Sequence, residues 1–223
     1  MAAVGLLFVG AVLFINGIML LGWVDAKSAA PMNFFVGALQ IITPTYLIFT
    51  AGGDAEVILM ASGLYLFAFT YLYVALNLTF NLSGTGLGYF CLFVAISALV
   101  FSYLNFTRFN DVGFGVIWLY WVFLWALFFV LLGLGREGLS RYTGAVCAIQ
   151  GWVTGWLPAL LLLTGLYEAY KRPLAIGLAI FGVVVFALLF VLLRPGRAGV
   201  VAPSGPRAEP GTAAPLARED HVR

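Results

Sequence analysis

Hydrophobic residues in this chain form seven long runs, and no run contains a charged residue in its interior. An α-helix needs about 20 apolar residues to cross a bilayer, whereas membrane β-strands alternate apolar and polar residues in short segments. The pattern therefore predicts an all-α, polytopic membrane helix bundle. The expected spans are Ala2–Gly22, Met32–Thr50, Val57–Asn77, Gly86–Tyr103, Val112–Gly135, Thr143–Leu166 and Leu174–Leu193.

The segments between these runs are short, so neighbouring helices should pack antiparallel. The first run has no basic residue ahead of it and no convincing cleavage site, so we interpret it as a retained span rather than a signal peptide. Lys and Arg favour the cytoplasmic side of a membrane. An external N-terminus and a cytoplasmic C-terminus give the better distribution, with Lys27, Arg136, Arg141, Arg194 and Arg197 inside, against Arg108, Lys171 and Arg172 outside.

Composition supports a membrane protein with a polar tail. The chain is 63% hydrophobic and 9% charged, with a mean hydropathy of +1.07, which excludes an ordinary soluble domain. We expect a transmembrane channel domain over residues 1–194 and a disordered, Pro/Arg-rich cytoplasmic tail over residues 195–223. The net charge is only +2, and no dense basic cluster indicates nucleic-acid binding.

The sequence offers little chemistry for an enzyme. Cys91 and Cys147 fall inside predicted spans, where packing is their expected role, and the one histidine, His221, lies in the tail. A hydrolase needs a nucleophile with a base or a metal, and the spans contain no Asp, Glu, His or Lys in their interiors. We therefore predict no catalytic residue, no metal site and no cofactor.

Ionisable groups inside a membrane mark proton and ion pathways, so their absence points to a small, neutral, polar solute. In the first span, Val9, Leu13 and Asn16 are spaced i, i+4 and i+7 and share one helix face, which Leu6 extends. An amide at the end of an apolar stripe fits a narrow pore with one polar contact. The alternative is an Asn that hydrogen-bonds a neighbouring helix, which the spacing alone favours.

Aromatic residues form stripes in two other spans. The third span has Phe69 and Tyr73 at i, i+4, followed by Asn77, and the fifth has Trp118, Trp121 and Trp125 on one face. Trp gathers at membrane interfaces, but this stripe extends over about two turns, so part of it lies deeper. Flat indole rings can guide a flat amide and exclude bulkier or hydrated solutes, although core packing or an interfacial belt fits the stripe equally well.

The sixth span combines an amide with small residues. It holds Gln150, and Gly151 and Gly155 form a G-x-x-x-G pattern, which permits close approach of a neighbouring helix. We expect Pro158 to kink this span.

Several stretches resemble one known family, in order and with compatible spacing over roughly residues 4–165. They are Gly5–Gly17, Met32–Gly37, Phe69–Tyr73 with Asn77–Phe80, Leu92–Ile96, Trp118–Trp125 and Trp156–Ala159. They are similar to the AmiS/UreI family of amide transporters and urea channels. The resemblance implies six helices per protomer, each protomer with its own pore, assembled as a homo-hexameric ring in the lipid bilayer.

The resemblance also implies which side chains line the pore and select solutes by size and planarity. The expected pore residues are Leu6, Val9, Leu13, Asn16, Phe69, Tyr73, Trp121, Leu124 and Trp125, with Asn77, Trp118 and Gln150 as secondary candidates. We thus predict a passive channel for urea or short-chain aliphatic amides in the bacterial inner membrane. It would feed a cytoplasmic urease or amidase.

Two departures from the family pattern refine this prediction. The external segment Ala51–Glu56 is short and no loop contains histidine, the usual acid switch, so we predict a pore that is not acid-gated. The run Leu174–Leu193 adds a seventh span. Two alternatives to the channel stay open: an ion-coupled amide or urea transporter, and a membrane scaffold that acts through its tail.

Overall fold

The computed structural model describes residues 2–193, and the regular secondary structure in this part of the chain is helical. The predicted tail over residues 195–223 lies outside the described residues. The helices are α1 Ala2–Leu20, α2 Ala26–Thr50, α3 Ala55–Phe80, α4 Thr85–Thr107, α5 Val112–Phe128, α6 Ser140–Gln150, α7 Leu157–Leu163 and α8 Tyr167–Leu192. Two π-helical segments, η1 Phe129–Gly133 and η3 Gly151–Trp156, and a 3₁₀ turn, η2 Glu137–Leu139, complete the order.

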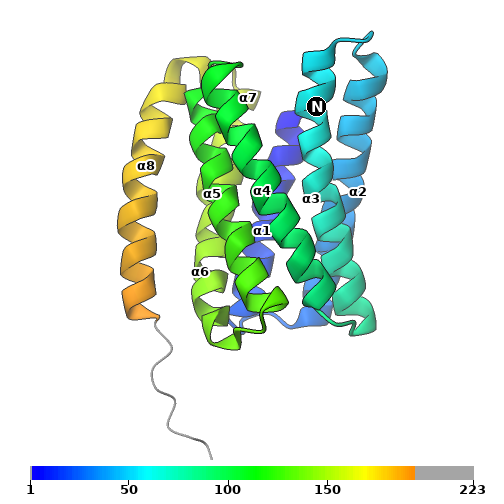
Figure 1. Ribbon diagram of the computed structural model, residues 1–223, viewed down its shortest axis with the longest axis vertical. Helices are drawn as coiled ribbons and strands as arrows, with labels where there is room; N and C mark the ends of the chain where they lie inside the picture. Colours follow the sequence, from blue (N-terminus) through cyan, green and yellow to red (C-terminus); the bar gives the residue numbers. More distant parts are fainter. Residues whose placement is uncertain (1, 194–223) are drawn as a thin grey trace, which may run out of the picture.

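Seven helical stretches in the described part are long and apolar enough to cross a membrane, which confirms the predicted all-α membrane bundle. Five of the stretches are α1, α2, α3, α4 and α8. The fifth in chain order joins α5 to η1, and the sixth runs from η2 through α6 and η3 to α7. An odd number of passes puts the two described ends of the chain at opposite ends of the bundle (Figure 1).

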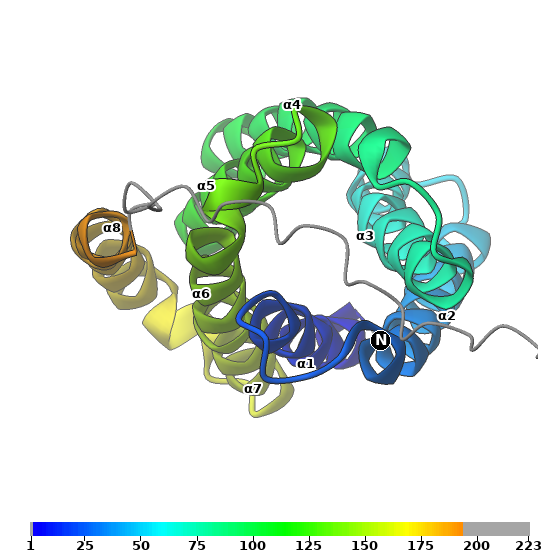
Figure 2. The same cartoon turned by 90° about the horizontal axis from the view of Figure 1, so that it is seen from below.

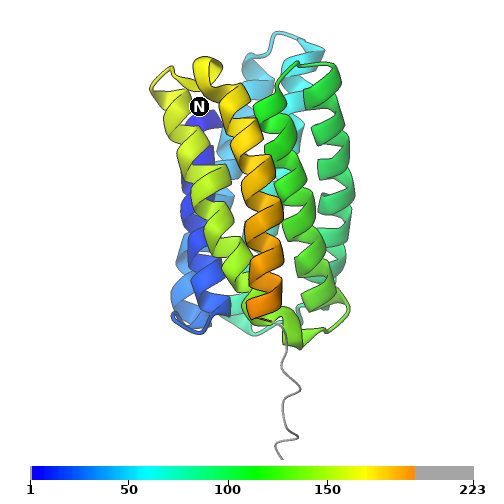
Figure 3. The ribbon, with the colours of Figure 1, turned by 90° about the vertical axis from the view of Figure 1, so that its left-hand side faces the viewer.

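The first six spans form a closed ring. Each helix from α1 to α6 contacts the next one along the chain, and α6 returns to contact α1. Figure 2, which looks along the bundle, shows this ring, with α3 and α5 separated by α4 around its circumference. The seventh span, α8, lies outside the ring, and Figure 3 shows it across the junction of α5 and α6.

Two helices begin earlier than the sequence predicts, so the expected starts at Met32 and Leu174 are wrong. Helix α2 begins at Ala26, where the Asp25 side chain caps the backbone N–H of Ser28, and it continues through Pro31. Helix α8 begins at Tyr167 and continues through Pro173. Both prolines lie within the first two turns, so each removes at most one backbone hydrogen bond near a helix start.

The sixth span is irregular where its glycines meet α1. The π-helical segment η3 ends just before Leu157 and Pro158; π-helical turns widen a helix locally and often occur at functional sites. A Cβ atom added at Gly155 would lie 2.4 Å from the Cα atom of Gly10, and one at Gly151 would lie 2.5 Å from the Gly10 carbonyl oxygen. The close helix approach predicted from the G-x-x-x-G pattern is therefore confirmed.

Candidate functional site

An aromatic cluster joins α3 and α5 across the interior of the ring. The Phe67 ring of α3 meets Trp121 and Trp125 of α5 edge to face, with centroids 4.7 and 5.1 Å apart. Trp118 completes the cluster, 5.7 Å from Phe67 and 4.8 Å from Trp121. All four rings are buried. Because α4 separates the two helices around the ring (Figure 2), these side chains meet inside it.

Two threonine hydroxyls fix the indole rings of this cluster. The Nε1–H group of Trp125 donates to Thr70 Oγ1 at 3.2 Å, and that of Trp121 donates to Thr154 Oγ1 at 3.1 Å. Each hydroxyl in turn donates to the carbonyl oxygen four residues earlier in its own helix, at 2.7 Å. Both indole N–H groups are thus satisfied inside the protein, and neither Trp121 nor Trp125 has a free donor.

The structure does not bring Phe69 and Tyr73 to the tryptophans, which corrects the predicted arrangement of the third span. Phe69 is 51% exposed and stacks on Tyr65. A Cβ atom at Gly86 would lie 2.3 Å from the Tyr73 hydroxyl, so Tyr73 packs against the start of α4. Each residue turns a helix by 100°, so Phe69 points about 200° away from Phe67.

The aromatic residues of α3 that face inward lie two positions before Phe69 and Tyr73 in the sequence and have the same spacing. Phe67 and Tyr71 are spaced i, i+4 and are both at most 2% exposed. Their rings lie 6.5 Å apart. Within the described part of the chain, the Tyr71 hydroxyl has no hydrogen-bond partner. It is therefore a buried polar group whose hydrogen bond is unfilled among the described residues.

Helix α1 contributes an apolar wall. Leu6, Val9 and Leu13 are buried and belong to the same core as Leu124 of α5 and the aromatic cluster. The carbonyl oxygen of Leu13 accepts a hydrogen bond from Cys147 Sγ of α6 at 3.2 Å. The predicted stripe of the first span therefore does face the bundle interior, with Leu124 close to it in the same core.

Asn16, at the end of this stripe, pairs with an amide of the next helix. Its Nδ2–H group donates to Asn33 Oδ1 at 2.9 Å, and Asn33 Nδ2–H donates back to Asn16 Oδ1 at 2.6 Å. Asn33 also donates to the Ala29 carbonyl oxygen at 3.0 Å. The interhelical hydrogen bond that the spacing alone favours is thus present, and the pair uses one of the two Nδ2–H groups of Asn16.

The three secondary candidates occupy different surroundings. Trp118 belongs to the cluster and stacks on Phe101 of α4 at 4.8 Å. Gln150 donates through Nε2 to the Tyr120 carbonyl oxygen at 3.1 Å, while its buried Oε1 has no partner among the described residues. Asn77 lies near the end of α3 and donates to the Ser83 carbonyl oxygen at 3.3 Å, away from the cluster.

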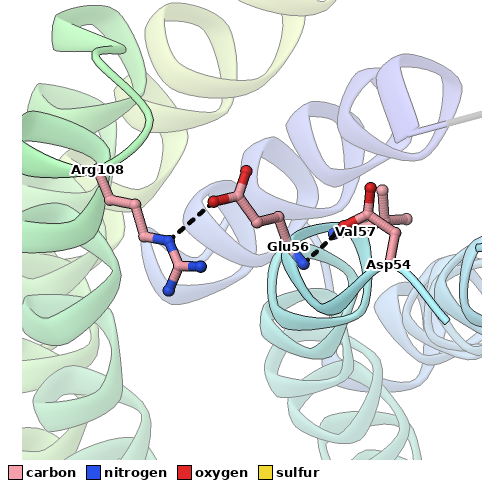
Figure 4. A network of polar contacts seen from close by, with 4 residues as sticks. All are labelled: Asp54, Glu56, Val57 and Arg108. Carbon is pink, nitrogen blue, oxygen red and sulfur yellow. Dashed lines mark hydrogen bonds and ion pairs between the residues drawn. The ribbon is translucent and has the colours of Figure 1, made fainter.

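Polar contacts join the ends of neighbouring helices at one end of the ring. Arg108, just after α4, donates through Nε to Glu56 Oε1 of α3 at 2.9 Å (Figure 4). Asp54 caps α3 through the backbone N–H groups of Glu56 and Val57. At the same end, the Tyr167 hydroxyl donates to Asp111 Oδ1 at 2.6 Å. Within residues 2–193, no group of three His, Cys, Asp or Glu residues is placed to hold a metal ion.

The sequence interpretation missed Phe67, Tyr71 and the two threonines that hold the indole rings. The third span alternates aromatic residues, and two i, i+4 pairs offset by two positions fit it equally well. Thr70 was the available signal, because it lies on the same face as Phe67 and would be the polar partner for an indole. Thr154 and Asn33 require the neighbouring helix to be known, so no spacing within one span reveals them.

The comparisons with known proteins bear on this arrangement. The family model described as AmiS/UreI family transporter matches residues 1–166. This chain belongs to the AmiS/UreI family. One relative is the putative transporter protein AmiS2 of Rhodococcus erythropolis, which is 50% identical over 198 residues. The match covers 89% of this chain and 96% of AmiS2. A putative amidate substrates transporter protein of Mycolicibacterium smegmatis is also 50% identical, over 194 residues, with 87% of this chain and 91% of the relative covered. These AmiS/UreI relatives are named as transporters, not enzymes.

The AmiS/UreI family also includes a solved channel. The crystal structure of the urea channel from Helicobacter pylori superposes with a TM-score of 0.67 at 35% identity, covering 73% of this chain and 97% of the channel. The H. pylori protein is named an acid-activated urea channel, and its alignment of 187 positions takes in 70% of this chain and 94% of the relative. Part of that alignment therefore consists of segments that only the H. pylori protein has. Helix α8 begins at Tyr167, beyond the AmiS/UreI family match.

Proposed function

We propose that this protein is a passive channel for urea or short-chain aliphatic amides. The observation that carries the proposal is the Phe67–Trp121–Trp125 cluster, whose indole N–H groups are bonded to threonines, so that neutral ring faces line the interior of the ring. The relatives named as an amidate substrates transporter and as a urea channel support this class of solute.

The proposed path follows the apolar wall of α1 and the aromatic cluster. A flat, uncharged amide sheds part of its hydration and passes along Phe67, Trp121 and Trp125, whose rings are in edge-to-face contact and would have to part to admit it. Buried polar atoms that lack partners in the described part, the Tyr71 hydroxyl and Gln150 Oε1, would replace some of the lost hydrogen bonds. Contacts that are weak and spread over several sites favour rapid passage.

The rival within transport is an ion-coupled carrier, which needs an ionisable coupling group. Residues 28–53, 57–107, 112–135 and 142–167 contain no Asp, Glu, Lys, Arg or His. A passive pore therefore fits better. The gradient would be maintained by a cytoplasmic urease or amidase that consumes the solute.

The test is osmotic light scattering of proteoliposomes that contain the purified protein and no hydrolase. We expect urea and acetamide to enter faster than glycerol, with an uncoupler having no effect. Trp125→Phe removes the N–H donor held by Thr70 and one ring of the indole, so the urea/acetamide flux ratio should change. Trp152→Phe is the matched control, because Trp152 is half exposed and contacts Phe14 and Trp156 instead. Equal flux ratios in both variants would refute the assignment of the cluster, and uptake abolished by the uncoupler would favour the carrier.

The pore should also conduct without an acid trigger. The carboxylates at the end shown in Figure 4 already have partners: Glu56 pairs with Arg108, Asp54 caps α3, and Asp111 accepts from Tyr167. The connection between α2 and α3 is only residues 51–54. Urea flux is therefore expected to stay level between neutral pH and about pH 5, where histidine switches act. A several-fold rise on acidification would contradict this part of the proposal.

In the cell, we place the protein in the bacterial inner membrane as a homo-hexamer, with the N-terminus outside and the tail inside. This orientation puts more basic residues on the cytoplasmic side, as the positive-inside rule favours: Lys27, Arg136, Arg141, Arg194 and Arg197, against Arg108, Lys171 and Arg172 outside. Chemical labelling of a cysteine introduced at Gly53, in intact cells with an impermeant reagent, tests the orientation. Labelling at Gly53 and not at Gly138 is expected, and the reverse would invert the topology.

A further inference from the structure

The seventh span leaves an open apolar groove on the outside of the ring. Helix α8 lies against α5 and α6 (Figure 3), and a cavity of about 700 Å³ runs between them. On α5 it extends from Val116 to Leu127, and at its lower end Leu139 and Tyr142 line it. That volume lies in the range of small-molecule binding sites, roughly 300–1,000 Å³.

The groove stays open because α8 turns small residues toward it. Ala179, Gly182 and Ala187 line the groove from α8. A Cβ atom at Gly182 would lie 2.6 Å from the Tyr120 hydroxyl, which sets how close α8 comes to α5. The contact is fixed rather than loose, since Tyr120 donates to the Leu178 carbonyl oxygen and Tyr142 donates to the Phe186 carbonyl oxygen.

These two tyrosines also indicate what kind of molecule the groove can bind. They supply the hydroxyl groups at the groove wall, and α8 carbonyls already accept from both. The remaining lining side chains are aliphatic or phenylalanine, apart from backbone atoms. The groove therefore offers a hydrocarbon environment with no polar group to pair, and a hydrocarbon chain is the occupant that leaves no hydrogen bond unmade.

Two arginines lie beside one end of this groove. The Arg136 carbonyl oxygen accepts a hydrogen bond of 3.0 Å from the backbone N–H of the groove residue Leu139. Arg141 precedes the groove residue Tyr142. Both arginines are exposed, and neither forms an ion pair within residues 2–193. Glu137 is the acidic residue of this segment, so the local charge is positive.

We propose that the groove binds one acyl chain of an anionic glycerophospholipid, with the headgroup phosphate held by Arg136 and Arg141. On α8 the lining runs from Ala179 to Phe190, which contacts Tyr142 beside the arginines. This eleven-residue rise spans about 16 Å at 1.5 Å per residue, which matches one leaflet of a hydrocarbon core about 30 Å thick. Basic sites at the membrane surface between transmembrane helices recognise anionic headgroups. The proposal does not depend on which solute the pore conducts.

The test is a lipid titration of the purified full chain in detergent micelles, followed by native mass spectrometry. Phosphatidylglycerol is the anionic lipid and phosphatidylcholine is the comparison. We expect one phosphatidylglycerol per chain bound more tightly than phosphatidylcholine. About 1 kcal/mol per basic residue at a membrane surface corresponds to about a 5-fold weaker Kd for each arginine removed. Arg136→Gln and Arg141→Gln should show this loss for phosphatidylglycerol only. Arg172→Gln, at the opposite end of α8, is the matched control and should bind like the wild type.

A groove variant tests the acyl chain separately. Ala187→Phe fills the groove and should displace both lipids, whereas Val184→Phe adds the same bulk on an exposed face of α8 outside the groove and should displace neither. Equal affinity for the two lipids, with no effect of the arginine variants, would overturn headgroup recognition. Unchanged lipid binding in Ala187→Phe would overturn the acyl site. If Ala187→Phe instead changes the oligomeric mass and leaves lipid binding intact, the groove is a contact between copies of the chain.

Discussion

The contact between α1 and α6 gives the sharpest mutational test of how the ring is held. A Cβ atom added at Gly17 of α1 would lie 2.3 Å from the backbone N atom of Ala148 and 2.6 Å from both its Cα and Cβ atoms. Ordinary contacts begin near 3.4 Å. Gly17→Ala therefore forces the two helices apart by about 1 Å, because backbone atoms cannot rotate away as a flexible side chain can.

The expected cost follows from overpacking. An extra methyl group in a close-packed interface costs about 1–3 kcal/mol, and a chain of this size loses about 2–4 °C in Tm for each kcal/mol. Gly17→Ala should therefore lower the Tm by roughly 2–12 °C. Urea flux should fall as well, because α1 carries Val9, Leu13 and Asn16 along the proposed path. Removing the Ala148 side chain in a Gly17→Ala/Ala148→Gly variant should not restore either property, since the nearest clash is with backbone.

Thermal unfolding in detergent and light scattering in proteoliposomes measure the two effects. Gly177→Ala is the matched control, because a Cβ atom there has no neighbour within 4 Å and alanine is the better helix former by roughly 0.5–1 kcal/mol. We expect Gly177→Ala to unfold at the wild-type temperature or slightly above it. If Gly17→Ala unfolds at the same temperature as Gly177→Ala, the close approach of α1 and α6 described above is incorrect.

Two further predictions concern single polar contacts. Thr70→Val leaves the buried indole N–H of Trp125 without its acceptor, at a cost of about 1–3 kcal/mol, so we expect a lower Tm and an altered urea flux. Thr107→Val is the control and should change neither, because it removes the same kind of hydroxyl-to-carbonyl bond at an exposed site. Ser28 donates to the Asp25 carboxylate from its hydroxyl and backbone N–H, which lowers the pKa of Asp25 from 3.8. This capping stability is present above the unfolded-state pKa and is lost as the pH falls through the folded-state value, so Asp25→Ala should lower the Tm at neutral pH and have no effect in strong acid.

Sequence reasoning located the spans well and their faces poorly, for one physical reason. A span is recognised by the length of its apolar run, which the membrane thickness dictates. The face of a soluble helix is recognised by the contrast between apolar and polar sides, and lipid removes that contrast. Phe67 and Phe69 are equally hydrophobic, yet one lies inside the cluster and the other is half exposed.

Span one was easier to orient because its small and polar residues break this symmetry. Gly17 lies on the side that meets α6 and Gly10 on the side that meets η3, and Asn16 marks a side that cannot face lipid without a partner. The early start of α2 was harder to foresee. It depends on the Asp25 cap and on the tolerance of Pro31 near a helix start, whereas a hydropathy pattern ends at the first polar residues.

The hydrogen bonds of the indole rings change the expected role of the tryptophans. A Trp side chain has a single N–H donor, and a free donor inside a pore would bind an amide carbonyl strongly enough to slow its release. Thr70 and Thr154 accept the donors of Trp125 and Trp121, and each threonine hydroxyl is itself satisfied by a backbone carbonyl. In the proposed pore the tryptophans would therefore form an apolar wall, and neither indole ring can turn without breaking its hydrogen bond to a threonine. Selection by such a wall would depend on the thickness and planarity of the solute, and its hydrogen bonds would come from groups such as the Tyr71 hydroxyl, which lacks a partner among the described residues.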